Sequence, residues 1–331
     1  MRPLHRALAA IAVALFLLVV IDAAVRMTFP RTERLNENFS ASYLRREVRA
    51  LRGTSPIVVF GDSALWGYGL SSDKAAVSLL RRAGLPLENL SYEGGSLPNS
   101  YAMLRLLLAR GVRPSVVVFN VNQKEFNPND SAYAKLHPSV EQLVWSTLAP
   151  ADRALLKATT TDAPDQRLQR AIETGWQLYG LRTDLRELLF SDVDAVHALQ
   201  TALETVSGTR ARRLAAHRPT PALFEGTYDM TPLAPSNVGF QFLARIADLL
   251  RSEHIRALAI LTPTNHALLH DYIDSPEYVA NLRASRRALE SRGVRVLDLD
   301  RAFPASEFID NDHLTAAGNV RFAGLLREAL R

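Results

Sequence analysis

The sequence predicts an α/β protein with a parallel sheet and helices on both faces. Short runs of consecutive apolar, mostly β-branched residues occur at Ile57–Phe60, Ser115–Asn122 and Arg256–Leu261, as expected of strands buried on both faces. Segments with apolar residues at helical spacing separate these runs. This alternation of strand and helix is typical of a parallel sheet with helices packed on both sides.

The first half of the sheet is expected within residues 56–122. The strand Ile57–Phe60 runs into a tight turn, Gly61-Asp62-Ser63, and Ser71 or Ser72 can cap a helix that continues to Leu80. The next expected elements are a short strand at Asn89–Ser91, a helix at Pro98–Arg110 and a third strand at Ser115–Asn122.

No buried-strand pattern follows between about residues 124 and 236. Leucines at helical spacing predict a helical insertion there, interrupting an α/β domain that spans 56–331. Such an insertion can shape access to a site, or can simply thicken the fold. The alternation then resumes with a helix at 237–253, a strand at 256–261, a helix at 276–292, a strand at 294–297 and a last helix capped by Thr315.

The N-terminus, residues 1–25, is predicted to be a membrane anchor or a signal segment. Basic residues precede an apolar run, Ala7–Ile21, that Ala23–Val25 extends to roughly the 20 residues that a bilayer-spanning helix needs. We expect an uncleaved anchor with the body outside the cytoplasm, in the periplasm. Secretion after signal cleavage is the alternative, although the cleavage pattern is poor. Residues 26–55 are expected to be a stem, helical from Ser42 to Leu51.

Composition excludes several function classes. The chain has 331 residues, a net charge of +5 and arginines scattered among acids, which argues against nucleic-acid binding. The Arg210–Arg213 cluster is read as a solvated helix face rather than a phosphate or lipid-headgroup site. The absence of cysteine excludes disulfides, zinc–thiolate sites and cysteine nucleophiles. No metal-ligand spacing or phosphate-binding glycine loop occurs, so neither a metal nor a cofactor is expected.

Three residues have the pattern of a serine nucleophile with its base. Ser63 follows the first strand, and ligands bind at the carboxyl ends of strands in a parallel α/β sheet. A serine hydroxyl needs a base, and the base needs an orienting partner. His313 follows the fifth strand and therefore lies at the same edge, with Asp310 three residues earlier. Asp312 is the rival orienter if the local turn differs.

An oxyanion hole needs donors around the same edge. The candidates are the Ser63 N–H group, an N–H group at Gly94 or Gly95 after the second strand, and the side-chain amide of Asn122 after the third. Asp62 is expected to fix the turn rather than react. Four further residues could line a substrate site or serve only packing: Trp66, Tyr68, Asn265 and His266.

These motifs, taken in chain order, resemble the SGNH (GDSL-type) hydrolase superfamily. The resemblance rests on Gly61-Asp62-Ser63, a glycine in the second block, an asparagine in the third and Asp310-x-x-His313 in the fifth, and covers about half of the chain. It implies a flavodoxin-like three-layer fold with five parallel strands. It also implies Ser63 as nucleophile, His313 as base, Asp310 as orienter, and Gly94 with Asn122 in the oxyanion hole. The third block, Asn120-Val121-Asn122-Gln123, departs from the usual Gly-x-Asn-Asp, and Asn120 is the fallback.

The anchor and the insertion resemble, in architecture alone, a membrane-anchored branch that modifies extracytoplasmic polysaccharides, namely alginate O-acetyltransferases and DltD-like proteins. This resemblance implies an O-acyltransferase, with an acyl donor, a carbohydrate acceptor and a membrane-bound acyl-transfer partner. Two alternatives remain: a hydrolytic esterase or deacetylase of the same fold, and a non-catalytic module that binds a glycan or a partner protein.

Overall fold

A five-stranded parallel sheet forms the centre of the molecule in the computed structural model. The strand order is β2-β1-β3-β4-β5, the flavodoxin-like order of doubly wound folds, so the predicted fold class is confirmed. The strands are β1 (Ile57–Phe60), β2 (Leu87–Asn89), β3 (Val116–Val121), β4 (Arg256–Leu261) and β5 (Arg295–Asp298). The structure describes residues 2–28, 34–35, 39, 41–127, 131–156, 172, 176–180, 219–228 and 231–331.

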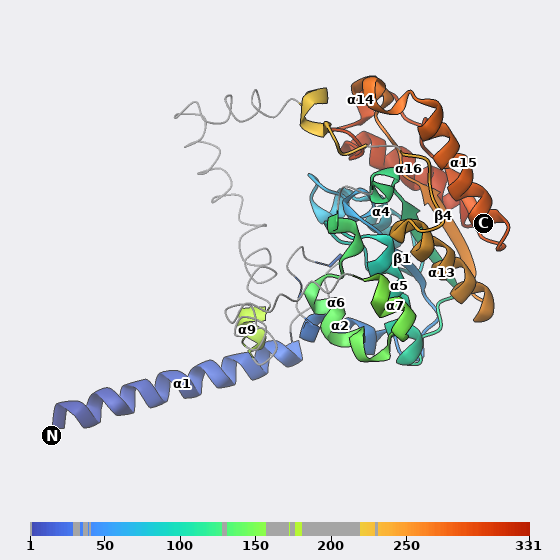
Figure 1. The fold of residues 1–331 in the computed structure, drawn as a ribbon. Helices are drawn as coiled ribbons and strands as arrows, with labels where there is room; N and C mark the ends of the chain where they lie inside the picture. Colours follow the sequence, from blue (N-terminus) through green and yellow to red (C-terminus); the bar gives the residue numbers. More distant parts are fainter. Residues whose placement is uncertain are drawn as a thin grey trace, which may run out of the picture.

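Helices cover both faces of this sheet (Figure 1). The elements of the N-terminal half are α1 (Arg2–Thr28), α2 (Ala41–Ala50), α3 (Ser63–Trp66), η1 (Ser72–Lys74), α4 (Ala76–Arg82), α5 (Leu97–Ala109), η2 (Gln123–Phe126), η3 (Ser131–Ala134), α6 (Pro138–Val144), η4 (Trp145–Thr147) and α7 (Pro150–Leu155). Those of the C-terminal half are α9 (Gln177–Gly180), η5 (Pro221–Phe224), α13 (Val238–Ser252), α14 (His266–Ile273), α15 (Pro276–Glu290), η6 (Ala305–Glu307) and α16 (Ala316–Ala329).

A hydrophobic core lies on each face of the sheet, because successive side chains along a strand point to opposite faces. Phe60 and Phe119 point to one face, where they pack with α2, α5, α6 and α13. Val59 and Val118 point to the other, where they pack with α4 and α16. Every strand residue of β3 is buried, as the continuous valine run predicted for a strand covered on both sides.

Most predicted boundaries hold within two residues, and two helical regions differ from the prediction. The second strand is Leu87–Asn89 rather than 89–91, because pairing with β1 begins at Ile57 opposite Leu87. The predicted helix from Ser71 or Ser72 is split by the extended Ala75. The next helix, α4, begins where the side chain of Asn319 in α16 accepts a hydrogen bond from Ala76 N–H. A helix, α14, was missed directly after β4.

The segment predicted as a stem is partly built into the fold. The predicted helix is present as α2, and its Tyr43, Leu44 and Val48 are buried in the core beside the sheet. Leu35 and Phe39, upstream of the helix, join the same core. Apolar residues at helical spacing were correctly read as a helix, but their burial means that this helix packs as a layer of the domain.

Between β3 and β4, the described secondary structure consists only of helical segments (η2 to α13). Much of the predicted insertion, including Arg210–Arg213, lies outside the described residues. The division of the chain into anchor, stem and interrupted domain therefore stays a prediction.

The N-terminal helix α1 projects from the body (Figure 1). Its stretch His5–Val25 is long and apolar enough to cross a membrane or to serve as a signal sequence. The C-terminal part of this helix contacts the rest of the chain. Val25 packs against the core, and a carboxylate oxygen of Asp22 accepts a hydrogen bond from Leu178 N–H at 2.6 Å.

Candidate active site

The strand β1 delivers Ser63 to the carboxyl edge of the sheet on the first turn of α3. Gly61 turns the chain with φ of 157°, and a Cβ atom there would lie 2.2 Å from Asn120 Oδ1, so only glycine fits. Asp62 then caps α3, since its Oδ1 accepts a hydrogen bond from Ala64 N–H at 2.9 Å. The predicted turn-fixing role of Asp62 therefore matches its contacts.

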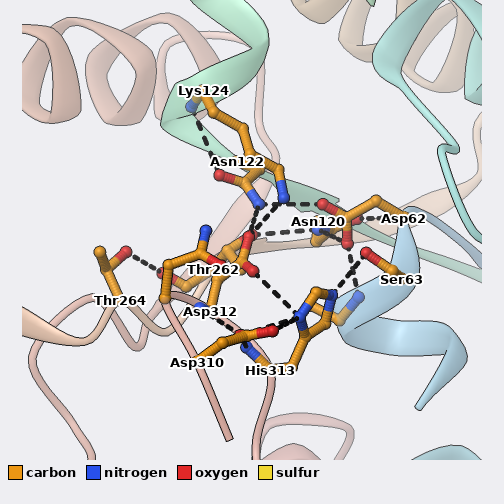
Figure 2. Close-up of polar contacts among 12 residues, drawn as sticks. Asp62, Ser63, Asn120, Asn122, Lys124, Thr262, Thr264, Asp310, Asp312 and His313 are labelled. Atoms are coloured by element: carbon orange, nitrogen blue, oxygen red, sulfur yellow. Dashed lines mark hydrogen bonds and ion pairs between the residues drawn. The ribbon is translucent and has the colours of Figure 1, made fainter. Parts of the chain in front are cut away.

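The serine, the histidine and an aspartate meet although they are far apart in the sequence (Figure 2). Ser63 Oγ lies 2.7 Å from His313 Nε2. On the other side of the ring, His313 Nδ1 lies 2.7 Å from Asp310 Oδ2. Asp310 also accepts hydrogen bonds from the backbone N–H groups of Asp312 and His313, so its own loop fixes the carboxylate. This is the geometry of a nucleophile, a base and an orienter.

Asp312, the rival orienter, takes a different position. Its Oδ2 atom lies 2.6 Å from Lys124 Nζ and 2.6 Å from Asn122 Nδ2. Its Oδ1 atom lies 3.5 Å from His313 Nδ1, beyond the 2.7 Å of Asp310. Asp310 is therefore the carboxylate that hydrogen-bonds the imidazole, and Asp312 forms a buried ion pair behind it.

The side-chain amide of Asn122 is engaged by two carboxylates of the site. It donates to Asp62 Oδ2 at 2.9 Å and to Asp312 Oδ2 at 2.6 Å. The fallback, Asn120, donates to Asp62 Oδ1 and Thr262 Oγ1. Both amides therefore tie the loops around Asp62, Thr262 and Asp312 together. The oxyanion role of Asn122 stays a prediction, one for which its amide would have to leave a carboxylate.

Two backbone N–H groups remain for an oxyanion. Among the hydrogen bonds of the described residues, none uses the N–H of Ser63 or of Gly94 as donor. Gly94 is exposed with φ of 75°. Gly95, the other predicted glycine, is buried and donates its N–H to Tyr92 O at 3.0 Å. Gly94 is thus the better donor of the two.

Charges around the imidazole favour its protonated form. Burial alone lowers the pKa of His313, but the carboxylates of Asp312 and Asp310 outweigh burial and raise it above the ordinary value. For Asp312, burial acts to raise the pKa, yet Lys124 and His313 together hold it below its ordinary value. The site is therefore an electrostatically coupled set in which Lys124 supplies positive charge behind the base.

The predicted substrate-lining aromatic residues differ in position. The ring of Tyr68 lies 4.4 Å from that of His313, and Tyr68 is 38% exposed, so it borders the triad and solvent. Trp66 instead faces the N-terminal segment: its Nε1 donates to Leu35 O, and the Arg34 guanidinium lies 4.0 Å above its ring. Trp66 is therefore a packing residue of this structure.

The same guanidinium closes the end of the serine-bearing helix. Arg34 donates hydrogen bonds to the carbonyl oxygens of Trp66, Gly67 and Leu70 at 2.9–3.0 Å. These carbonyls belong to the last residue of α3, to its C-cap and to the turn that follows. A residue upstream of the domain thus fixes the chain that leaves the nucleophile.

The two predicted residues after β4 have separate roles. Asn265 Nδ2 donates to Asp310 O at 2.9 Å, and Asn265 caps α14, so this residue holds the loop that carries the base. His266 Nε2 lies 2.8 Å from Asp300 Oδ2, and none of its described hydrogen bonds or ion pairs joins it to the triad. Asn265 supports the site, whereas His266 belongs to a neighbouring polar cluster.

Lys124 and Glu125 were not predicted from the sequence to belong to the site. Both are buried, and they follow Asn122 and Gln123 on η2. Two charged residues directly after a buried strand were a usable signal, because buried charges need partners. Glu125 Oε2 accepts a hydrogen bond from Leu97 N–H at 2.7 Å, at the start of α5.

Donor atoms of Asp310, Asp312 and His313 lie within 4.8 Å of one another, a spacing that a metal ion could use. Each is already engaged: His313 by Ser63 and Asp310, and Asp312 by Lys124. These three residues therefore fit a triad and an adjoining ion pair, and we assign no metal to them.

Comparisons with known proteins give distant similarities. A protein-family model matches residues 234–331, which include β4, β5 and the Asp310–His313 loop. No curated protein matches the sequence. A crystal structure of TesA is 14% identical, with a TM-score of 0.39, and the match covers 84% of this chain and 98% of that chain. LAE5, an alpha/beta hydrolase enzyme from the metagenome of Lake Arreo, Spain, is 12% identical, with a TM-score of 0.39 and coverages of 88% and 97%. The fold class rests on the strand order and on the two helical layers.

Proposed function

We propose that this chain is a membrane-anchored serine enzyme that transfers an acyl group to a hydroxyl of an exported or cell-envelope polysaccharide. One observation carries the enzymatic part: Ser63 Oγ lies 2.7 Å from His313 Nε2, and Asp310 binds the opposite ring nitrogen at 2.7 Å. This arrangement activates a hydroxyl that is otherwise a poor nucleophile.

Acylation begins when Ser63 Oγ attacks the carbonyl carbon of an acyl ester and His313 Nε2 accepts the hydroxyl proton. The negative charge on the tetrahedral oxygen is stabilised by the N–H groups of Ser63 and Gly94. Collapse of this intermediate breaks the ester C–O bond, and the imidazolium returns its proton to the leaving oxygen. Asp310 accepts the Nδ1–H hydrogen bond throughout and stabilises the imidazolium.

Deacylation repeats these steps with a second hydroxyl. The acceptor oxygen loses its proton to His313 Nε2 and attacks the acyl carbon, and Ser63 Oγ leaves with that proton. A sugar hydroxyl as acceptor gives an O-acylated glycan, and water gives hydrolysis. Tyr68 supports a sugar acceptor, because its partly exposed ring borders His313 and aromatic rings present a broad apolar face.

The contacts of α1 support an anchor retained in the working protein. Val25 packs against the core and Asp22 accepts a hydrogen bond from Leu178 N–H, whereas a cleaved signal segment needs no contact with the body. An anchor would hold the site beside a membrane-bound acyl donor or partner protein. The acyl group, the acceptor and this partner belong to the proposal by architectural analogy.

A serine-directed fluorophosphonate probe tests the chemistry on the full chain in detergent. We expect covalent labelling that Ser63→Ala abolishes and that Ser252→Ala, at an exposed helix end, leaves unchanged. Asp310→Asn should slow labelling by about 10³–10⁴-fold, because the imidazole loses the partner that fixes its tautomer. Absence of a Ser63 adduct, where a known esterase is labelled, would support a binding module instead.

A second assay separates transferase from hydrolase. An acetyl-ester donor is supplied with and without a soluble oligosaccharide, and acetylated sugar and free acetate are measured. We expect acetylated sugar to form with wild type and not with Ser63→Ala. If only acetate appears at every acceptor concentration, the transferase proposal is rejected and an esterase remains.

A further inference from the structure

We propose that Lys124 is a positioning residue for the catalytic base: it pairs with Asp312, so that the charge of this second carboxylate on His313 is partly compensated and Asp310 remains the hydrogen-bonded partner of the imidazole. This inference rests on the proposed function for its catalytic meaning. Its structural basis is independent of that function, since it follows from which charges lie around the imidazole.

The imidazole of His313 lies between two carboxylates from its own loop. Asp310 Oδ2 is 2.7 Å from Nδ1 and Asp312 Oδ1 is 3.5 Å from the same atom. Asp312 is 1% exposed, so solvent screens its charge poorly. Two uncompensated carboxylates at these distances would hold the ring as an imidazolium, which cannot accept the serine proton.

Lys124 partly compensates the charge of Asp312. Its Nζ atom lies 2.6 Å from Asp312 Oδ2, and the lysine is itself buried. Burial acts to lower the pKa of Lys124, but Asp312 and Asp62 outweigh burial and raise it well above the ordinary value, so the ammonium form persists. The lysine also contributes a repulsion that lowers the pKa of His313.

A hydrogen-bonded chain fixes the pair. The Asn122 amide bridges Asp312 Oδ2 and Asp62 Oδ2, and Asp62 caps the helix that bears Ser63. The lysine, the base loop and the nucleophile helix therefore form one network (Figure 2). A change at Lys124 acts on the base through Asp312, whereas Lys124 has no hydrogen bond to His313 or Ser63 among those of the described residues.

The groups that can alter this balance come from five parts of the fold. The loop after β5 provides Asp310 and Asp312, η2 provides Lys124, and the cap of α3 and the turn after this helix provide Asp62 and Tyr68. Two tyrosines that interact electrostatically with Lys124 complete the set, Tyr133 and Tyr228. Tyr228 also accepts a hydrogen bond from Asn311 Nδ2. At neutral pH the tyrosines are uncharged. Among the groups named here, Lys124 therefore supplies the positive charge that compensates the carboxylates.

Removing Lys124 should raise the pKa of His313, and removing Asp312 should lower it. Lys124→Met leaves Asp312 as an uncompensated carboxylate. In a plot of labelling rate against pH, the acid limb reports the titration of His313, and it should move up by about one to three pH units. Asp312→Asn leaves the lysine charge without its carboxylate, and the limb should move below that of wild type. The double variant Lys124→Met/Asp312→Asn should return the limb to wild type or below. A purely structural role would slow labelling in each case without shifts of opposite sign.

The experiment measures labelling rate against pH for the full chain in detergent, with thermal unfolding to establish that each variant is folded. Arg245→Met is the matched control, because Arg245 Nε forms an ion pair with the buried Asp152 at 2.8 Å, away from the triad; its acid limb should not move. Shifts of the same sign for Lys124→Met and Asp312→Asn, or unmoved limbs in folded variants, would overturn the proposal.

A second measurement does not depend on acyl chemistry. The imidazole of His313 is titrated by NMR in a Ser63→Ala background, with the signal assigned by its loss in His313→Gln. The same opposite shifts are expected there. If they occur although no variant labels at any pH, the role of Lys124 stands and the proposed function fails; if labelling occurs without the shifts, the reverse holds.

Discussion

At the residue scale, the buried carboxyl group of Glu125 makes the stability of the fold depend on pH. Burial and the nearby Asp62 raise the pKa of Glu125 to about 8, from an ordinary 4.5. Between these values the folded chain binds a proton that the unfolded chain releases, so the free energy of unfolding falls as pH rises from about 4.5 to about 8.

Glu125→Gln should remove this dependence. The amide oxygen can still accept the hydrogen bond from Leu97 N–H, and the side chain no longer has to stay protonated. We expect the variant to gain stability over wild type by a few kcal/mol at pH 8 and to match it more closely at pH 5. Denaturant unfolding at both pH values measures the difference. Equal slopes against pH for the two proteins would contradict the assignment.

Some residues of the site could be predicted from the sequence alone, and others could not. Ser63, Asp310 and His313 were predictable because each stands in a short motif at a strand end, and strand ends share one edge. The Lys124–Asp312 pair joins residues separated by 188 positions, with no local pattern to connect them. The engagement of Asn122 was equally hidden, because it depends on which carboxylates surround its amide in space.

At the element scale, the loop between β2 and α5 packs tightly against the turn before Ser63. A Cβ atom on Gly95 would lie 2.1 Å from Gly61 O. Gly95→Ala should therefore destabilise the fold by about 2–3 kcal/mol through overpacking, and should slow probe labelling because it moves the neighbouring Gly94 N–H that we propose for the oxyanion hole.

Gly84→Ala is the matched control for Gly95→Ala. Gly84 has φ of 89°, and no atom lies within 4 Å of a Cβ built there. It should lose only the roughly 1 kcal/mol of a left-handed backbone and keep its labelling rate. Thermal unfolding and labelling are compared for both variants. If the two alanine variants behave alike, the close approach of the two turns is not what restricts Gly95.

The start of α14 connects a helix cap to the loop that carries the base. Asn265→Asp keeps an oxygen acceptor for the cap but loses the amide that donates to Asp310 O. We expect near wild-type stability with slower labelling, whereas Asn265→Ala should also lose about 1 kcal/mol of capping energy. Ser275→Ala removes the equivalent cap of α15 and should lower stability alone. Unchanged labelling in Asn265→Asp would show that Asp310 needs no support from α14.

At the scale of the whole molecule, the chain should behave as an integral membrane protein. We expect the full chain to stay in the membrane fraction after washing with alkaline carbonate, and the mature N-terminus to lie before His5. The apolar span His5–Val25 provides the retention, since the net charge of +5 is too small and dispersed. Release by the wash, or a mature N-terminus after residue 22, would establish a cleaved signal segment.

The parallel sheet and its two helical layers could be predicted because valine runs and helical spacing are local properties of the sequence, whereas the flavodoxin-like arrangement was implied only by the resemblance to a family. The missed helix, α14, begins directly after a Thr-Pro-Thr-Asn stretch that is typical of a loop, and its cap is the same asparagine that holds Asp310. The role of the segment before α2 was also hidden, because polar residues conceal the buried Leu35 and Phe39. In each case a contact between distant segments decides the structure.

Arg34 sets a limit on how the chain can be shortened to make it soluble. Its guanidinium holds the carbonyl oxygens of Trp66, Gly67 and Leu70, and the neighbouring Leu35 O accepts the hydrogen bond from Trp66 Nε1. A truncation that begins at α2 would expose the indole and strip these oxygens of their partner, four residues or fewer from the end of the serine helix. A truncated protein that lacks the hydrophobic span but retains the residues from 30 onward keeps these contacts. The boundary chosen for expression therefore decides whether the nucleophile is presented in its native position.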